Sequence, residues 1–148
     1  MIPLYLLIAS FIAFLLLGRE GVVYFRVWQH ALRAALGAMF LLTASAHWGK
    51  RRADLIAMVP IAFPRPTLLV TLTGILETIG AVALQIPKLA FFTATGLFLM
   101  LIAVFPANIY AARHRLKIAG QPVPGLLTRS IIQVIFLVAL WFAGAPAQ

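Results

Sequence analysis

The sequence predicts an all-α fold: a transmembrane helical bundle with a four-helix core and one additional N-terminal helix. The first observation behind this fold class is composition, because 64% of the 148 residues are hydrophobic, only 10% are charged and the mean hydropathy is +1.05. A soluble domain carries about 25% charged residues. The second observation is that the apolar residues gather in five stretches, each near the length that a helix needs to cross the ~30 Å hydrocarbon core of a bilayer. We therefore expect one transmembrane helical domain over residues 1–148.

The five apolar stretches are predicted to be helices because a segment inside lipid must satisfy its own backbone hydrogen bonds. The predicted spans cover residues 2–17, 32–48, 67–86, 89–112 and 130–145. The alternative for the first span, a signal peptide, requires a basic region before it and a small-residue cleavage site after it, and both are missing. We therefore expect the first span to remain as a membrane helix.

Two connections between the spans are more apolar than ordinary loops. Residues 19–33 alternate apolar and polar side chains and suit an interfacial helix that leads into the second span. Residues 50–66 open on three basic residues and continue as an apolar run with three prolines, which prevent a long helix. Two interpretations of this second connection remain open. It is either an interfacial or re-entrant segment, with residues 55–63 packed over one mouth of the bundle, or a loop that rests on lipid headgroups.

The basic residues predict the orientation, because cytoplasmic loops carry an excess of Lys and Arg. We name the side that holds the loops after the second and fourth spans side X, and the opposite side is side Y. Side X has eight basic residues: Lys50, Arg51, Arg52, Arg65, Arg113, Arg115, Lys117 and Arg129. Side Y has four: Arg19, Arg26, Arg33 and Lys88. We therefore expect side X in the cytoplasm of a bacterial inner membrane, with the N-terminus inside and the C-terminus outside.

The net charge of +9 indicates the kind of partner. The basic residues lie between the apolar spans and form no aromatic-interleaved stripe, so we expect contacts with membrane lipids, including anionic headgroups, and no nucleic acid. The chain has no cysteine and its three histidines lack metal-ligand spacing, so no metal site is expected. It also lacks a nucleotide-binding glycine loop and a nucleophile elbow, so no catalytic residue can be assigned.

Glu77 is the most informative residue, because it lies near the middle of an otherwise uncharged span. A charged side chain at the bilayer centre costs ~2.5–3.5 kcal/mol on insertion scales. Such a residue is expected to face the bundle interior, a partner or a ligand, and the cost of its charge favours the protonated carboxyl. Gly74 and Gly80 flank Glu77 on the same helix face, so a neighbouring helix can approach it closely.

Four further polar residues are expected near Glu77 because of their depth in the spans. His47 ends the second span on side X, and Asn108 lies near the side X end of the fourth. Arg129 begins the fifth span from side X, and Gln133 is one turn deeper. Glu77 is ten residues into its span, or ~15 Å deep. The five side chains are therefore predicted to form one ligand-binding pocket with Glu77 as its floor. Glu77 is expected to hydrogen-bond to at least one of His47, Asn108 or Gln133.

The sequence also leaves a purely structural role open for these residues. Gln133 and Asn108 can simply tie helices together through hydrogen bonds. His47 can be an interfacial residue, and Arg129 can be a topology charge that reaches up to the headgroups. Pro106 should kink its helix and free a backbone carbonyl, which either serves a site or only shapes the bundle.

A series of short motifs in register resembles the DoxX-like family of small membrane proteins. The motifs are Leu32-Arg33-Ala34-Ala35-Leu36-Gly37, Ala46-His47-Trp48, Met58-Val59-Pro60, Phe63-Pro64, Gly74-Ile75-Leu76-Glu77 with Gly80, Ile86-Pro87, Val104-Phe105-Pro106-Ala107-Asn108-Ile109-Tyr110, and residues 127–141 with Arg129 and Gln133. They extend roughly over residues 32–142, and the first span departs from the common four-helix pattern of the family.

The resemblance implies an accessory role near redox systems, because the family includes subunits similar to those of thiosulfate:quinone oxidoreductase and partners of secreted redox enzymes. We therefore expect an integral membrane accessory or assembly protein that binds a partner protein, such as a redox enzyme, or a lipid-like ligand in the intramembrane pocket. The alternative is a subunit of a quinone-linked membrane oxidoreductase in which Glu77 and His47 handle protons. No cofactor is evident, and a quinone or a lipid is the compatible ligand. A homo-oligomer is compatible with the sequence, which does not decide whether the chain is an enzyme.

Overall fold

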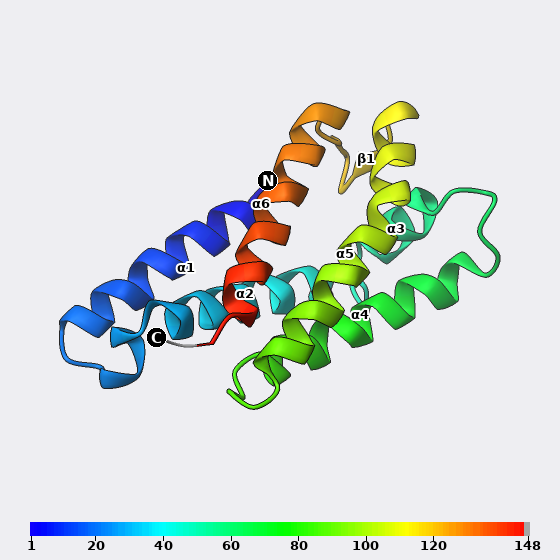
Figure 1. The fold of residues 1–148 in the computed structure, drawn as a ribbon. Coiled ribbons are helices and arrows are strands. Elements are labelled where there is room, and N and C mark those ends of the chain that lie inside the picture. Colours follow the sequence, from blue (N-terminus) through cyan, green and yellow to red (C-terminus); the bar gives the residue numbers. More distant parts are fainter. Residues whose placement is uncertain (147–148) are drawn as a thin grey trace.

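The computed structural model describes residues 1–146, and the predicted all-α fold is confirmed (Figure 1). The helices are α1 (Ile2–Arg19), η1 (a 3-10 helix, Val23–Arg26), α2 (Trp28–Ala46), α3 (Arg52–Met58), α4 (Pro66–Ala83), α5 (Ala90–Arg113) and α6 (Leu126–Gly144). Two short antiparallel strands, β1 (Lys117–Ile118) and β2 (Gln121–Pro122), form a hairpin between α5 and α6. Helices thus form the whole body of the molecule, and the hairpin lies at one end of it.

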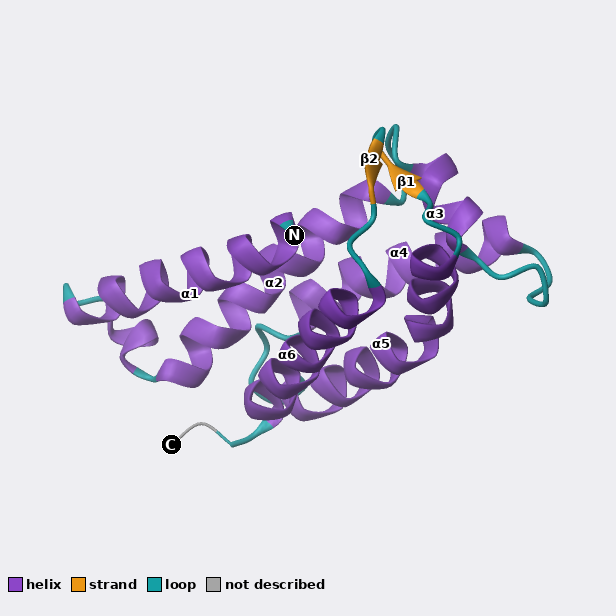
Figure 2. Ribbon diagram, turned by 90° about the horizontal axis from the view of Figure 1, so that it is seen from above, coloured by secondary structure: helices purple, strands orange, loops and turns teal. Residues whose placement is uncertain are grey.

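The helices form a four-helix core with α1 on its outside. In the core, α2 packs against α4 and α6, and α5 also packs against α4 and α6. The N-terminal helix α1 packs mainly along α2. Figure 2 shows α1 and α2 lying beside the α5–α6 pair. The predicted bundle of four core helices and one N-terminal helix is therefore what the structure contains.

Four helices, α1, α4, α5 and α6, are long and apolar enough to cross a membrane. The fold is therefore compatible with an integral membrane protein. Helix α2, predicted as the second span, is not among the four, although its 19 residues give a length of ~28 Å. Its composition differs because it carries buried polar residues, including Gln29 and Arg33. A helix that is shielded by its neighbours can hold such groups when they find hydrogen-bond partners.

The connection from α1 to α2 differs from the predicted interfacial helix. The first helix continues to Arg19, and the chain then turns at Gly21, where φ is 112°. After η1, α2 begins at Trp28 rather than at residue 32. The polar residues of its first turns are buried in the bundle, which is why they join α2 instead of lying on the membrane surface.

The core is centred on α2 and is tightest where α4 approaches it. The largest fully buried side chains are Phe40, Leu36, Met39, Leu84 and Leu140. A Cβ atom on Gly74 of α4 would lie 2.7 Å from the Cβ of His47. A Cβ atom on Gly80 would lie 2.6 Å from the Cδ2 of Leu97 in α5. The glycines on either side of Glu77 thus allow two neighbouring elements to press against α4.

The segment after α2 forms a short helix followed by an exposed loop. Helix α3 packs on α4, α5 and the β1–β2 hairpin, and Met58 at its end is buried. The Asp54 carboxylate accepts a 2.8 Å hydrogen bond from the backbone N–H of Ala119 in the hairpin turn. The loop then leaves the bundle, and Ile61 is 91% exposed. The helical part covers the side X end of the bundle, as in the first interpretation of this segment, whereas the loop projects from it.

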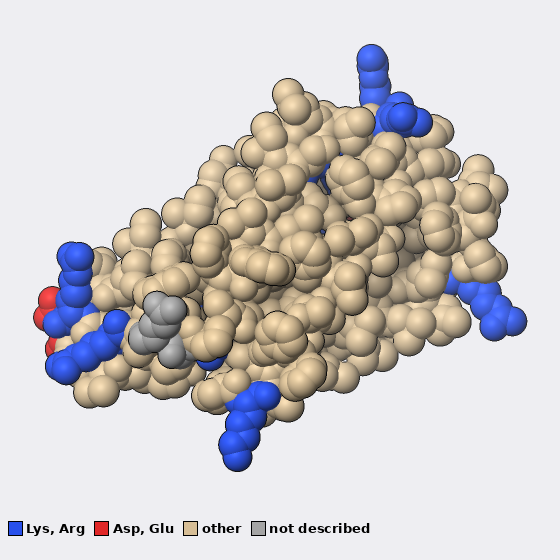
Figure 3. Space-filling view, in the orientation of Figure 1, with Lys and Arg blue, Asp and Glu red and all other residues tan. Residues whose placement is uncertain are grey.

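Lys and Arg side chains gather at the two ends of the elongated body and leave a broad belt of other residues between them (Figure 3). Charged residues of a membrane protein concentrate at the two interfaces in this way, because the hydrocarbon region between them penalises charge. The face in Figure 3 thus has the charge distribution that the fold class predicts.

Candidate functional site

The five residues of the predicted pocket lie in two separate places. His47 and Glu77 face each other between α2 and α4, and we name them the His–Glu pair. Arg129, Asn108 and Gln133 are joined by hydrogen bonds between α5 and α6, and we name them the polar row. Within residues 1–146, no hydrogen bond or ion pair connects the two sets. The structure therefore differs from the single pocket that we expected.

The difference has a geometric cause. Depth in a span fixes the level of a side chain in the membrane, but it does not fix the neighbour that the side chain faces. Helix α4 turns Glu77 towards α2, whereas α6 packs its polar residues on α5. Residues at similar depth thus meet in pairs of helices rather than around a common centre.

The His–Glu pair is buried at the end of α2. His47 is 8% exposed and Glu77 is 9% exposed. The Nδ1 atom of His47 lies 3.8 Å from Oε2 of Glu77, which is an ion-pair distance but too long for a hydrogen bond. The same Nδ1 atom is 3.1 Å from the carbonyl oxygen of Thr43, so it carries a proton and donates it there. Glu77 therefore faces the interior with His47 as its neighbour, but among residues 1–146 it makes none of the predicted hydrogen bonds to His47, Asn108 or Gln133.

The Oε2 atom of Glu77 is buried and has no hydrogen-bond partner. Thr43 is the other polar side chain beside the carboxyl group, but its hydroxyl donates to the carbonyl of Phe40. An uncompensated charge at this position is costly, so the pair as a whole is neutral. It is either a protonated carboxyl beside a neutral imidazole, or a carboxylate beside an imidazolium. Chemically, the pair can take up or release one proton.

Arg52 closes the His–Glu pair on side X. Its guanidinium donates to the backbone carbonyl of His47 and to the hydroxyl of Thr71, each at 2.7 Å. These bonds hold the end of α2 and the start of α3 against α4. The groove described below is not lined by either residue of the pair. Among residues 1–146, no three His, Asp or Glu side chains come together as metal ligands.

The polar row is a continuous chain of hydrogen bonds. A guanidinium NH2 group of Arg129 donates to the side-chain oxygen of Asn108. The amide nitrogen of Asn108 donates to the side-chain oxygen of Gln133 at 3.0 Å. The amide nitrogen of Gln133 donates in turn to the backbone carbonyl of Leu101 in α5. Pro106 lies nearby in α5, and because it has no N–H, it leaves without that donor the carbonyl of Ile102, which is next to the Leu101 carbonyl that Gln133 bonds.

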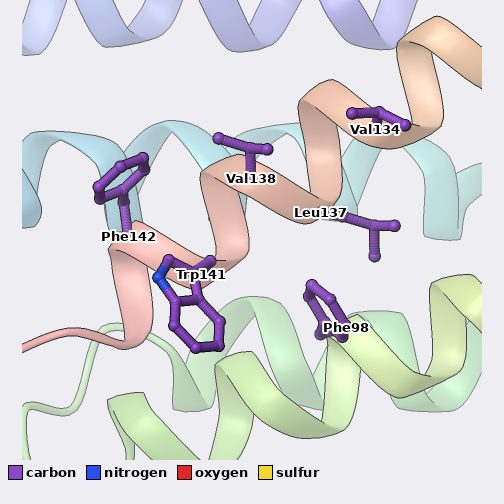
Figure 4. A pocket seen from close by; sticks show the side chains of 6 residues that line it. All are labelled: Phe98, Val134, Leu137, Val138, Trp141 and Phe142. Atoms are coloured by element: carbon purple, nitrogen blue, oxygen red, sulfur yellow. The ribbon is translucent and has the colours of Figure 1, made fainter.

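An apolar groove runs between α5 and α6, and Figure 4 shows the residues that line its larger part. One part of the groove has a volume of about 430 Å³ and the adjoining part about 150 Å³. The larger part is lined by Phe98, Val134, Leu137, Val138, Trp141 and Phe142. The smaller part is lined by Ile102, Phe105, Ser130, Gln133, Val134 and Leu137. Because the two parts share Val134 and Leu137, they form one groove, which we name the α5–α6 groove, with Gln133 at its end nearest side X.

Sequence reasoning missed the role of Arg33. The sequence predicted only that Arg33 lies on side Y, away from the five residues of the predicted pocket. In the structure its guanidinium donates to the carbonyls of Ala143 and Ala145 at the end of α6. The backbone carbonyl of Arg33 accepts a 3.0 Å bond from Gln85 of α4. The signal for this role was a basic residue within an apolar span, which requires partners such as the free carbonyls of a helix C-terminus.

The chain matches a family model over residues 36–143, and the family is described as Domain of unknown function (DUF8561). No curated protein and no solved structure matches the chain. The matched range extends from the middle of α2 almost to the end of α6, and it includes both the His–Glu pair and the polar row. Because the match covers most of the sequence, the chain belongs to the DUF8561 family.

Proposed function

We propose that this protein is an integral membrane accessory or assembly protein of the DoxX-like type, which binds a lipid-like ligand at the α5–α6 groove. The sequence motifs that resemble the DoxX-like family support the accessory role. In this proposal the apolar part of the ligand lies in the groove and its polar end meets the polar row. A partner protein, such as a redox enzyme, would approach the same complex from the membrane or from side X.

One observation carries the proposal: Gln133 belongs to the polar row and also lines the α5–α6 groove. A ligand in the groove therefore contacts apolar surface, while Asn108 and Arg129 of the polar row lie beyond Gln133 at the side X end of the groove. Amphipathic molecules such as lipids and isoprenoids have the same division. The sites that bind them are mostly apolar, with a few placed polar groups that fix orientation.

Native mass spectrometry of the detergent-purified protein tests this function, because it reports bound small molecules and the number of subunits together. We expect a co-purifying amphipathic molecule on the unmodified chain. Val134→Trp should abolish its retention, because Val134 lines both parts of the groove. Ile131→Trp is the matched control, since Ile131 is exposed on the same helix but does not line the groove. Equal retention in the two variants would contradict the proposal.

A second candidate function is a subunit of a quinone-linked oxidoreductase. The observation that favours it is the buried Oε2 of Glu77, which has no hydrogen-bond partner and lies near His47. A quinone takes up two protons when it is reduced by two electrons. The pair, which binds one proton reversibly, would deliver one of them, and the second would come from water. A partner redox enzyme would supply the electrons.

Quinone reduction in membranes that contain the protein distinguishes the two candidates. For the oxidoreductase subunit we expect a protein-dependent rate that Glu77→Gln abolishes while the variant still folds. Absence of such a rate, together with thermal stabilisation by added lipids, would favour the accessory protein. The proposed location is the bacterial inner membrane with the N-terminus inside.

A further inference from the structure

We infer that the ligand of the α5–α6 groove is an anionic phospholipid, with its phosphate on Arg129 and one acyl chain in the groove. This inference rests on the proposed function and specifies the chemical class of the ligand. Its basis is the unmatched charge of Arg129, its contrast with the other shielded arginines, and the position of the groove below it.

Arg129 carries a positive charge that the described residues 1–146 do not balance. It is half-buried in α6, and its one side-chain partner is the neutral amide of Asn108. Its Nε atom is buried and has no hydrogen-bond partner. The chain has only three acidic residues. Of these, Glu77 faces His47, Asp54 accepts a bond from the hairpin, and Glu20 follows α1 at the other end of the bundle.

The other arginines that the fold shields from solvent are used differently. Arg33 bonds two carbonyls with Nε and an NH2 group, and Arg52 bonds a carbonyl and a hydroxyl. Both are structural ties. Arg129 keeps its Nε free, and a buried donor without a partner costs free energy. A guanidinium binds phosphate through its N–H donors, and because the Nε of Arg129 is buried, a phosphate would meet the terminal NH groups and balance the charge.

The position of the groove fits a lipid whose phosphate is at Arg129. Helix α6 begins at Leu126, so Arg129 is ~5 Å below the side X end of the helix, at the level of headgroups. Gln133 is one turn deeper and lines the start of the groove. From Arg129 to Trp141, at the far end, the helix rises ~18 Å, whereas one hydrocarbon leaflet is ~15 Å thick. An acyl chain that extends from this phosphate across one leaflet would therefore lie along the whole length of the groove.

Competition between two phospholipids tests the inference. The probes are phosphatidylglycerol and phosphatidylcholine with identical acyl chains, added to the full-length protein in detergent and counted by native mass spectrometry. We expect the unmodified protein to prefer phosphatidylglycerol. Arg129→Gln should reduce this preference about fivefold, which corresponds to ~1 kcal/mol per basic residue near an anionic surface. Arg113→Gln is the matched control, because Arg113 is exposed at the side X end of α5, and it should change the preference less.

Two further variants keep the test decisive if Arg129→Gln does not fold. Arg129→Lys preserves the charge and should retain most of the preference. Asn108→Asp places a carboxylate where the Arg129 guanidinium already donates, so it supplies an internal counter-charge and should remove the preference. An unchanged preference in Arg129→Gln or Asn108→Asp would overturn the inference.

The failure of this inference is distinguishable from the failure of the proposed function. If Val134→Trp abolishes retention of both phospholipids and Arg129→Gln leaves the preference intact, the groove binds lipid and the headgroup assignment is wrong. If Val134→Trp retains both phospholipids as well as Ile131→Trp does, the groove is not the site and the proposed function is wrong too.

Discussion

Arg33 shows how this bundle accommodates a buried charge. Its Nε donates to the carbonyl of Ala143 at 2.8 Å, and an NH2 group donates to the carbonyl of Ala145 at 2.9 Å. Carbonyls at the end of a helix have no intrahelical partner, and the helix macrodipole favours a cation there. Arg33 therefore caps the last helix, and it ties α2 to α6 at the side Y end of the bundle.

Arg33→Ala should lower the free energy of unfolding by ~1–3 kcal/mol, because buried carbonyls lose their donors. Thermal or denaturant unfolding in one detergent measures this change. Arg26→Ala is the control, since Arg26 is exposed in η1 and its removal should leave the midpoint unchanged. Equal midpoints for the two variants would show that the cap does not contribute to stability.

Glu77→Gln reports the protonation state of the His–Glu pair. We expect the form with a protonated carboxyl and a neutral imidazole, because Nδ1–H of His47 is directed at the Thr43 carbonyl and Glu77 is 3.8 Å away. An amide then replaces a protonated carboxyl of the same shape, and stability should change by less than ~1 kcal/mol. Loss of ~3–5 kcal/mol in the same unfolding experiment is expected when one partner of a buried ion pair is removed. That result would contradict a protonated carboxyl beside a neutral imidazole.

At the scale of elements, the contact between α2 and α4 depends on the absence of a side chain at Gly74. A Cβ atom there would lie 2.7 Å from Cβ and 2.8 Å from Cγ of His47. These atoms are near the backbone and cannot move aside as the tip of a flexible side chain would. The two helices would have to separate, and the His–Glu pair would separate with them.

Gly74→Ala should therefore destabilise the protein by ~1–3 kcal/mol, the range for overpacking a tight contact. Gly96→Ala provides a matched control in α5, because nothing lies within 4 Å of a Cβ atom at Gly96. Alanine there should be neutral or stabilising by up to ~1 kcal/mol, since it is the better helix former. The readout is the difference between the two unfolding midpoints, and a Gly74→Ala variant as stable as Gly96→Ala would show that the helices can shift without cost.

The hairpin between α5 and α6 depends on a contact with α3. Ala119 and Gly120 form its turn with φ of 51° and 76°, and the carboxylate of Asp54 accepts from the Ala119 N–H. Asp54→Ala should raise the hydrogen-exchange rate of the Ala119 amide at least several-fold, because that N–H becomes open to solvent. Asp54→Asn retains an accepting oxygen and should preserve most of the protection. Similar exchange in Asp54→Ala and the unmodified protein would exclude the contact as a stabilising one.

Helix α2 shows which parts of the fold could be predicted from the sequence. Hydropathy identified α1, α4, α5 and α6 well, because these helices expose apolar faces whose composition depends little on their neighbours. The start of α2 was predicted too late, because Gln29 and Arg33 look like interfacial residues until a partner helix is present to bury them. Helix α2 can carry these polar residues because other helices surround it. The sequence of α2 alone does not reveal those neighbours.

The same limit explains the candidate site. The depth of Glu77 and its glycine-flanked face were visible in the sequence, and the side chain is buried in the structure. The division into the His–Glu pair and the polar row was not visible. The position of a residue in its span predicts its depth in the membrane, but not the helix that it faces. Helix packing determines that Glu77 of α4 faces α2 and that Gln133 of α6 faces α5.

At the scale of the whole molecule, hydrogen bonds at both ends show that α2, α4, α5 and α6 alternate in direction. At one end Asp54, just after α2, meets the hairpin that follows α5. At the other end Arg33, in the second turn of α2, meets the end of α6. The loops assigned to side X therefore lie together, and their basic residues form one charged end of the molecule. If that end faces the cytoplasm, the positive-inside rule is satisfied.

Cysteine labelling tests this orientation, because the chain has no native cysteine and each substitution gives one label. Gln121 is exposed in the hairpin on side X, and Lys88 is exposed in the connection between α4 and α5 on side Y. With a membrane-impermeant maleimide, Lys88→Cys should label in cells whose inner membrane is intact, and Gln121→Cys only after that membrane is permeabilised. Gln148→Cys, at a position outside the described residues, should label as Lys88→Cys does. Labelling of Gln121→Cys and Lys88→Cys from the same side would contradict the alternation of spans, whereas exchange of their two patterns would keep the alternation and reverse the orientation.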